Sequence, residues 1–402
     1  MKKIMAIILA LTLTFSLVAC GGDSSSAAVS GSGGATGSGS STIAGLDGEI
    51  KLGVITYLTG SSKETGDRQI QAVETAVKKI NGEGGVNGAE LKIEYFDAGT
   101  DQQSCINAVQ LAVNTADIAG IVGVFQSTNN LAYADIVKEA KIPTMCLGTS
   151  YNVRDLGNPY MWMPRVCDET ASQALARMCI ERGMKNPCIM WMTNASGQSQ
   201  HDAIVEYYEA QGLSIGLDLG FNVENETDYT PLVTQFLNSD CDGLIIDCYS
   251  NQGAPDIITL LTQYGYDMSK VAGVTAIFSS DLTDMVGGIV DGIYGISEYS
   301  PNADRAGTQA YVEAFEAEQN TFTSAWTDAV TYDAVLLLCE GARLGGGNDP
   351  ESINNGLADL KDFTDGALTD YTYNKDHSLG STLLITEFDG ADITFSDVMS
   401  AR

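Results

Sequence analysis

The sequence predicts an α/β fold with two lobes, each built on a parallel sheet wrapped by helices. Short β-branched runs alternate with amphipathic helical stretches from Glu49 onward, a pattern typical of parallel sheets. The same series of elements occurs twice along the chain. The chain has 402 residues, of which 44% are hydrophobic, whereas a single hydrophobic core stops growing at about 250 to 300 residues. Two packed lobes are therefore expected.

The first series opens with a strand at 51–55 and a helix at 67–81. Apolar residues recur on one face of this helix, and the glycine-rich stretch 82–85 ends it. The rest of the series continues the alternation with strands at 91–96, 118–124 and 143–147 and helices at 102–115 and 130–140.

The second series repeats this plan, with helices at 169–182, 200–211, 230–238 and 254–264 and strands at 188–192, 213–221, 243–247 and 271–274. Two further helices, at 306–319 and 326–344, carry apolar stripes that need a sheet to cover. We therefore expect the chain to return to the first lobe. Residues 383–388 and the flanking turns are expected to form a final hairpin.

The start of the chain has the features of an export signal. Basic residues precede an apolar run at 4–18, so residues 1–19 are predicted to be a signal peptide. The stretch Leu17 to Cys20 resembles the lipobox of bacterial lipoproteins, which implies cleavage before Cys20 and a lipid on its sulfur. The alternative is an ordinary leader with a chance cysteine. Residues 20–47, rich in Gly and Ser, are predicted to be a flexible tether.

The charge balance limits the partners of the protein. The chain carries 21 Lys and Arg against 52 Asp and Glu, a formal net charge of −31. Binding to nucleic acid depends on basic residues that neutralise phosphates. The excess of acidic residues therefore almost excludes nucleic acid as a partner. The net negative charge does not exclude a small ligand that is enclosed in a pocket.

The sequence lacks the patterns of common catalytic and metal sites, such as G-x-S-x-G, H-E-x-x-H, a P-loop or an EF-hand loop. Its two histidines, His201 and His377, are expected on the solvated surface. Eight cysteines follow Cys20 without a C-x-x-C pair, which favours free thiols, although their even number leaves disulfides as the alternative. We predict no catalytic residue, no cofactor and no metal.

Six collinear stretches between about residues 49 and 390 carry a family resemblance. They are Gly53 to Gly60, Gly66 to Ala72, Ile80 to Gly88, Ala140 to Pro143, Asp291 to Tyr294 and Thr331 to Ala334. Together they resemble the branched-chain amino acid (Leu/Ile/Val) type of periplasmic binding protein, the substrate-binding component of an ABC importer. The most specific stretch is Gly-Gly-Val-Asn-Gly after the preceding Ile-Asn.

The resemblance implies the type I periplasmic binding fold, with two Rossmann-like lobes that are joined by a three-segment hinge and close on a ligand. We expect the N-terminal lobe to comprise residues 48–167 and 300–369, and the C-terminal lobe to comprise 168–299 and 370–402.

Candidate ligand-binding residues follow the strands of the first lobe, at the edge where open parallel sheets bind ligands. Ser127 and Thr128 stand at a helix start, where hydroxyl and N–H groups suit a carboxylate; the alternative is that they only cap the helix. The next strand ends in Gly148, Thr149 and Ser150, and Gly148 lets a ligand approach the backbone. The resemblance implies that Ser127, Gly148 and Ser150 bind the α-carboxylate of the ligand.

In the second lobe the resemblance implies that Tyr249 is an aromatic contact of the ligand. It also places Thr275 where an acidic residue normally holds the ligand's ammonium group. Either Asp247 or Asp281 supplies this charge from a shifted position, or the ligand lacks an ammonium group, as an amide, a urea-like compound or a carboxylate would.

The sequence thus predicts an extracytoplasmic, lipid-anchored substrate-binding protein of an ABC importer. We expect it to capture an amino acid, branched-chain or related, or a similar small polar metabolite between two closing lobes. It is expected as a monomer on the outer face of the bacterial cytoplasmic membrane, with a membrane permease as partner. The alternative is a ligand-sensing receptor of the same fold that binds an amide, a urea-like compound or a carboxylate. An enzyme is not expected, since the constellations that catalysis needs are missing.

Overall fold

The computed structural model describes residues 48–60, 62–223, 225–249, 253–317, 325–380, 382–390 and 392–400. The predicted signal peptide at 1–19, the lipid-attachment residue Cys20 and the tether at 20–47 lie outside the described residues. No helix within the described ranges has both the length and the apolar character needed to cross a bilayer.

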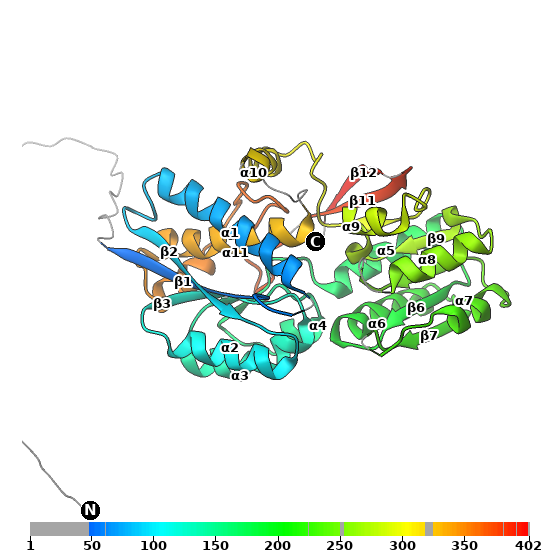
Figure 1. The fold of residues 1–402 in the computed structure, drawn as a ribbon, viewed down its shortest axis with the longest axis horizontal. Coiled ribbons are helices and arrows are strands. Elements are labelled where there is room, and N and C mark those ends of the chain that lie inside the picture. Colours follow the sequence, from blue (N-terminus) through cyan, green and yellow to red (C-terminus); the bar gives the residue numbers. More distant parts are fainter. Residues whose placement is uncertain are drawn as a thin grey trace, which may run out of the picture. The chain divides into compact units, whose positions relative to one another are not determined.

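The first sheet has five strands in the order β2-β1-β3-β4-β5, all paired in parallel. Figure 1 labels β1, β2 and β3 of this sheet. Its strands are β1 (Glu49–Thr56), β2 (Glu90–Asp97), β3 (Ile118–Val122), β4 (Thr144–Met145) and β5 (Met161–Trp162). Every residue of β3 is buried, because helices cover both faces of the sheet.

Helices α1 (Lys63–Gly82), α2 (Gln102–Asn114), α3 (Ser127–Ala140) and α4 (Tyr151–Arg154) follow the strands of this sheet. Alternate residues of β1 point to its opposite faces. Leu52 and Val54 pack in the same core as Val73 of α1, whereas Ile55 packs in a second core with Val109 of α2. The parallel, helix-covered sheet predicted from the alternating pattern is confirmed.

The second sheet has seven strands in the order β12-β11-β10-β9-β8-β6-β7. Five are parallel: β6 (Cys188–Met192), β7 (Leu217–Phe221), β8 (Leu244–Asp247), β9 (Val271–Gly273) and β10 (Tyr294–Ser297). The last two, β11 (Thr382–Asp389) and β12 (Asp392–Ser400), form the predicted hairpin, which lies antiparallel to β10. The helical elements between the strands are α5 (Asp168–Glu181), α6 (Ala195–Ala210), α7 (Thr230–Leu237), α8 (Ala254–Gln263), α9 (Ser280–Val286) and the short 3₁₀ turns η1 (Met268–Lys270) and η2 (Thr275–Ile277).

The chain passes between the two sheets three times, after β5, after β10 and before β11. Between the second and third passages lie α10 (Ala306–Ala317), α11 (Trp326–Gly345) and α12 (Pro350–Leu357). Tyr311 of α10 and Leu338 of α11 belong to the same core as Leu52 of β1, as does Leu379 just before the third passage. The residue boundaries of the two lobes stay a prediction.

A buried ion pair joins two of these three passages. Arg165 follows β5 and Glu298 follows β10, and their side chains are only 8% and 2% exposed. Nη2 and Nε of Arg165 lie 2.5 and 2.7 Å from Oε2 of Glu298. The backbone N–H of Val166 donates to the other carboxylate oxygen at 2.8 Å. The guanidinium also lies over the ring of Trp326, 4.4 Å from its centroid. Glu298 therefore fixes the backbone of one passage to another.

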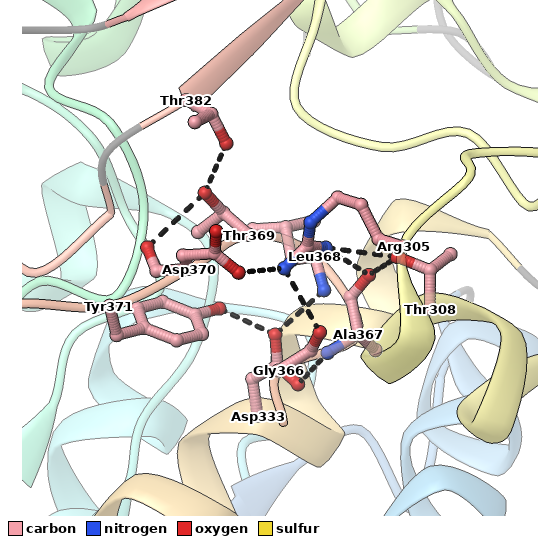
Figure 2. Close-up of polar contacts among 10 residues, drawn as sticks. All are labelled: Arg305, Thr308, Asp333, Gly366, Ala367, Leu368, Thr369, Asp370, Tyr371 and Thr382. Carbon is pink, nitrogen blue, oxygen red and sulfur yellow. Dashed lines mark hydrogen bonds and ion pairs between the residues drawn. The ribbon is translucent and has the colours of Figure 1, made fainter. Parts of the chain in front are cut away.

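A second buried carboxylate, Asp333 of α11, holds the segment that leads to β11 (Figure 2). It accepts hydrogen bonds from the backbone N–H groups of Ala367 and Leu368 at 2.6 and 2.8 Å and from the Tyr371 hydroxyl at 2.5 Å. Burial raises the pKa of Asp333 to about 7, and these hydrogen bonds act in the opposite direction. The guanidinium of Arg305 also belongs to this cluster, because it donates a hydrogen bond to the carbonyl oxygen of Ala367 at 3.3 Å.

Both histidines differ from the prediction of a solvated surface, because each stacks on a tryptophan. The ring of His201 lies 4.2 Å from that of Trp191, and the ring of His377 lies 4.2 Å from that of Trp162. The two nitrogens of His201 each lie 2.9 Å from a carboxylate oxygen, one belonging to Asp202. An imidazole can thus cover an apolar ring while its nitrogens stay hydrogen-bonded.

Candidate functional site

The carboxyl ends of β3 and β4 bring the predicted first-lobe residues together. Oγ of Ser127, at the start of α3, accepts hydrogen bonds from the backbone N–H groups of Thr149 and Ser150 at 3.1 and 3.2 Å. All three residues are buried. Because two N–H groups donate to this oxygen, the hydroxyl hydrogen of Ser127 points elsewhere and can be donated to a ligand.

Gly148 makes this contact geometrically allowed. A Cβ atom at this position would lie 2.7 Å from Oγ and 2.8 Å from Cα of Ser127. Only glycine therefore lets the two turns approach so closely. The missing side chain at Gly148 allows the two turns to pack closely. It would also allow a ligand to approach the backbone there.

Ser127 does not cap α3. The N-cap is Gln126, whose side chain makes no capping hydrogen bond, and the hydroxyl of Ser127 is directed at the neighbouring turn. Thr128, one residue further along, is exposed. Ser150, in contrast, caps α4 by accepting from the N–H of Asn152 at 3.2 Å. The structure thus groups Ser127 with the turn 148–150 and leaves the side chain of Thr128 on the surface.

Asp168 connects this turn to the second sheet. Its N–H donates to the carbonyl oxygen of Thr149 at 2.8 Å, and its Oδ2 accepts from Oγ of Ser196 in α6 at 2.8 Å. Burial raises the pKa of Asp168 to about 6, although hydrogen bonds from Thr149 and Ser196 lower it. A buried carboxyl group therefore lies where the carboxyl ends of strands from both sheets come near one another.

Tyr249 follows the end of β8 by two residues and is half-buried. Its hydroxyl oxygen accepts a hydrogen bond from Nδ2 of Asn194 at 3.3 Å, and Asn194 caps α6. Tyr57, at the end of β1, donates its hydroxyl to Oε1 of Gln126. Burial raises the pKa of Tyr57 well above its usual value, and the nearby Tyr249 phenol contributes to the same shift. The phenol of Tyr249 therefore lies near enough to Tyr57, which follows a strand of the first sheet, to act on it electrostatically.

The family pattern places an acidic residue at the position of Thr275, whereas the nearby acidic residue in this chain is Asp247. Thr275 is buried at the start of the short turn η2 and brings no charge. Asp247, the last residue of β8, is 0% exposed. Burial, reinforced by Asp168, raises the pKa of Asp247 well above its usual value. The side chain of Asp281 lies outside what the structure describes.

A second set of contacts joins α4 to α6. The backbone N–H of Tyr151 donates to Oγ of Ser199 at 3.0 Å, and the Tyr151 hydroxyl donates to Oδ2 of Asp202 at 3.1 Å. These bonds connect a helix that follows β4 of the first sheet to one that follows β6 of the second.

Sequence reasoning missed Tyr57, Asp168, Asn194 and Ser196. The position of Tyr57 directly after β1 and that of Asn194 shortly after β6 could have indicated them, since every strand of a parallel sheet ends at the same edge. Asp168 could not be found in this way, because it begins a helix after the first passage between the sheets.

In the described part of the chain, no group of three or more His, Cys, Asp or Glu side chains is placed to hold a metal ion. The eight cysteines from Cys105 to Cys339 are free thiols, and all but Cys241 are buried.

Residues 49–392 match the family model described as periplasmic binding protein. The chain belongs to this family. Leu/Ile/Val-binding protein homolog 8 of Brucella abortus is 23% identical over 343 residues, which are 79% of this chain and 82% of that protein. The family and the fold predicted from the sequence are thereby confirmed.

Two solved structures show the same fold. The branched-chain amino acid transporter substrate-binding protein LivJ of Streptococcus pneumoniae, in complex with isoleucine, has a TM-score of 0.77 at 20% identity and covers 88% of this chain and 99% of its own. A solute-binding protein of an ABC transporter from R. palustris, in complex with 4-hydroxybenzoate, has a TM-score of 0.78 at 17% identity and covers 88% and 97%. Our chain is thus a periplasmic substrate-binding protein of the ABC-transporter type with the type I fold.

Proposed function

We propose that the protein captures an amino acid, branched-chain or related, or a similar small polar metabolite, and delivers it to the permease of an ABC importer. The observation that carries this proposal is the junction at Asp168. There the Ser127 turn of the first sheet lies next to the start of α6 in the second sheet. A ligand held at this junction contacts both lobes at once.

The first-lobe turns suit a ligand carboxylate. The hydroxyl hydrogen of Ser127 and that of Ser150 can be donated, because both oxygens already accept from backbone N–H groups. The positive N-terminal end of α3 lies at the same place, which favours an anion there. Isoleucine and 4-hydroxybenzoate, the ligands of the two solved relatives, both carry a carboxylate on an apolar body.

The second-lobe residues suit the rest of the ligand. We place the ring of Tyr249 against the apolar body of the ligand, with Thr275 nearby as a neutral hydroxyl. The contacts of Tyr151 with Ser199 and Asp202 are then made in the closed state and lost on opening. A ligand shifts the population toward the closed state only if it touches both lobes.

We further propose that the mature protein begins at Cys20 and carries a lipid there, with residues 20–47 as a tether. More than one acyl chain on this residue anchors a protein firmly without a spanning helix. The protein would then stay on the outer face of the bacterial cytoplasmic membrane, beside its permease, as a monomer. Its excess of acidic residues keeps the folded part off an anionic lipid surface.

Thermal unfolding of the purified protein tests the binding function. The protein is expected to be stabilised by at least one compound from a panel of amino acids, amides, short carboxylates and nucleosides. At a concentration of 100 Kd a single-site ligand adds about 2.7 kcal/mol to the free energy of unfolding. Tyr249→Ala should remove most of this gain. Unfolding that no compound in the panel shifts would contradict the proposed function.

A further inference from the structure

The imidazole of His201 lies between the carboxylates of Asp202 and Asp218. Its Nδ1 is 2.9 Å from Oδ1 of Asp202, the next residue of α6, and its Nε2 is 2.9 Å from Oδ2 of Asp218 in β7. The ring stacks on that of Trp191, whose Nε1 donates to Oδ1 of Asp218 at 2.6 Å. The side chain of His201 is only 12% exposed. The ring is therefore held in one orientation, with each nitrogen directed at an acceptor.

The two carboxylates need hydrogen-bond donors, and His201 supplies them. An ionised carboxylate only accepts, so any hydrogen bond here is donated by the imidazole, and the protonated ring can donate to both carboxylates at once. Burial acts to raise the pKa of Asp202, but hydrogen bonds from His201, Gln198 and Tyr151 outweigh it and hold this pKa below its usual value. Asp202 is thus an acceptor whose Oδ1 is held by two side chains of its own helix, His201 and Gln198.

The other oxygen of Asp202 is directed at a helix of the first lobe. Oδ2 accepts from the hydroxyl of Tyr151 at 3.1 Å. Tyr151 begins α4 directly after Ser150, which caps this helix and ends the candidate ligand-binding turn at 148–150. The backbone N–H of Tyr151 donates to Oγ of Ser199, also on α6, at 3.0 Å. A chain of contacts therefore leads from the ligand-binding turn through Tyr151 and Asp202 to His201.

We propose that His201 is a positioning residue for closure of the lobes: its Nδ1–H holds the carboxylate of Asp202 in the orientation that accepts from Tyr151. This inference rests on the proposed function, in which the contacts of Tyr151 are made in the closed state. The side chain of Asp202 is 35% exposed, so without this hydrogen bond it can turn toward solvent. Because apparent affinity falls with the population of the binding-competent state, loss of the contact weakens ligand binding.

The contact between Tyr151 and Asp202 is expected to govern how long a ligand stays bound. The ligand enters while the lobes are open, and the contact forms as they close. Its loss therefore speeds opening and ligand release, and leaves the association rate nearly unchanged. A histidine that only packed against Trp191 would contribute to the free energy of unfolding without altering the dissociation rate.

Two amide substitutions of His201 test the inference, because each keeps one hydrogen-bond donor. The amide nitrogen of asparagine is as many bonds from Cβ as Nδ1 of histidine, so it can still donate to Asp202. The amide nitrogen of glutamine corresponds to Nε2 and is directed at Asp218 instead. His201→Gln is therefore expected to raise the dissociation rate about 3- to 10-fold, whereas His201→Asn should change it less than about twofold.

Stopped-flow tryptophan fluorescence of the purified chain measures the rate. The probe is the tightest binder among the twenty common amino acids and 4-hydroxybenzoate. Tyr151→Phe, which removes only the hydroxyl, should raise the rate as much as His201→Gln, and the two substitutions together should do no more than either alone. Asp256→Asn, at an exposed position of α8, is the control for a change of charge and should leave the rate unaltered.

The outcomes separate the inference from the proposed function. Equal dissociation rates in His201→Asn and His201→Gln, or no change in His201→Gln, would overturn the inference and leave a substrate-binding protein. Binding of no probe by the unmodified chain would count against the proposed function itself. If His201→Gln fails to fold, NMR decides, because the chain has only two histidines. The ring signals of His201 should move on probe binding in the unmodified chain but not in Tyr151→Phe, and signals that stay in place would refute the inference.

Discussion

Glu298→Ala is expected to lower the free energy of unfolding by about 3 to 5 kcal/mol, because it leaves the Arg165 guanidinium buried without a counter-charge. The guanidinium also donates to the carbonyl oxygen of Leu147 at 3.2 Å, one residue before Gly148. We therefore expect the variant to weaken ligand binding as well, since Arg165 would hold the turn at 148–150, which contacts Ser127, less firmly. Chemical denaturation followed by circular dichroism measures the first effect.

The matched control is Glu387→Ala. Glu387 also pairs with an arginine, Arg182, but both side chains are 40% exposed or more, and the separation is 3.0 Å. Exposed pairs of this kind contribute about 1 kcal/mol or less. Replacing both buried partners, as in Arg165→Met with Glu298→Leu, should restore part of the lost stability. If Glu298→Ala costs no more than Glu387→Ala, the buried pair does not fix the passages between the sheets.

Asp333→Ala is expected to cost about 3 to 5 kcal/mol, because it leaves two backbone N–H groups and the hydroxyl of Tyr371 buried without an acceptor. Figure 2 shows these contacts of Asp333 with Ala367, Leu368 and Tyr371, which lie in the segment before β11. The exposed Asp359→Ala should change stability by no more than about 0.5 kcal/mol. Equal effects of the two substitutions would show that the cluster around Asp333 is not structural.

The same residue gives the stability a dependence on pH. An unfolded chain loses the Asp333 proton near pH 3.8, whereas the folded chain keeps it until about pH 7. The folded state thus binds more protons between these values, and the free energy of unfolding falls as pH rises from about 4 to 7. Asp333→Asn, which cannot ionise, should lose this contribution. Its deficit relative to the unmodified chain is therefore expected to be larger at pH 4.5 than at pH 7.5.

Long helices and strands could be predicted from the sequence because their pattern of apolar and polar residues repeats within one segment. The helix expected at 326–344 is α11 (Trp326–Gly345), and the strand expected at 188–192 is β6. Strands β4 and β5 are only two residues each, too short to show alternation, and α4 is a single turn. Helix α12 could have been found, since Asp349 and Pro350 form a typical helix start.

The proximity of the proposed first-lobe residues could be predicted from the sequence, whereas their role in binding stays a prediction. Ser127, Gly148, Thr149 and Ser150 come together because strand order places the turns after β3 and β4 side by side. The sequence could not show that the oxygen of Ser127 accepts hydrogen bonds from two backbone N–H groups. Ser127→Ala is therefore expected to disturb the turn at 148–150 in addition to the proposed ligand contact. Asp168 was missed because it lies just after the chain passes from the first sheet to the second. The periodicity of the sequence does not show which residues meet there, such as Asp168 and Ser196.

Native mass spectrometry of the protein with a mixture of amino acids, amides and short carboxylates tests the central claim most directly. The claim is that one small molecule is held between the turn at 148–150 and Tyr249. We predict a complex with one ligand per chain, which Tyr249→Ala diminishes and Asp256→Asn preserves. A spectrum that shows only the bare chain in the presence of the full mixture, or a complex that Tyr249→Ala leaves unchanged, would contradict it.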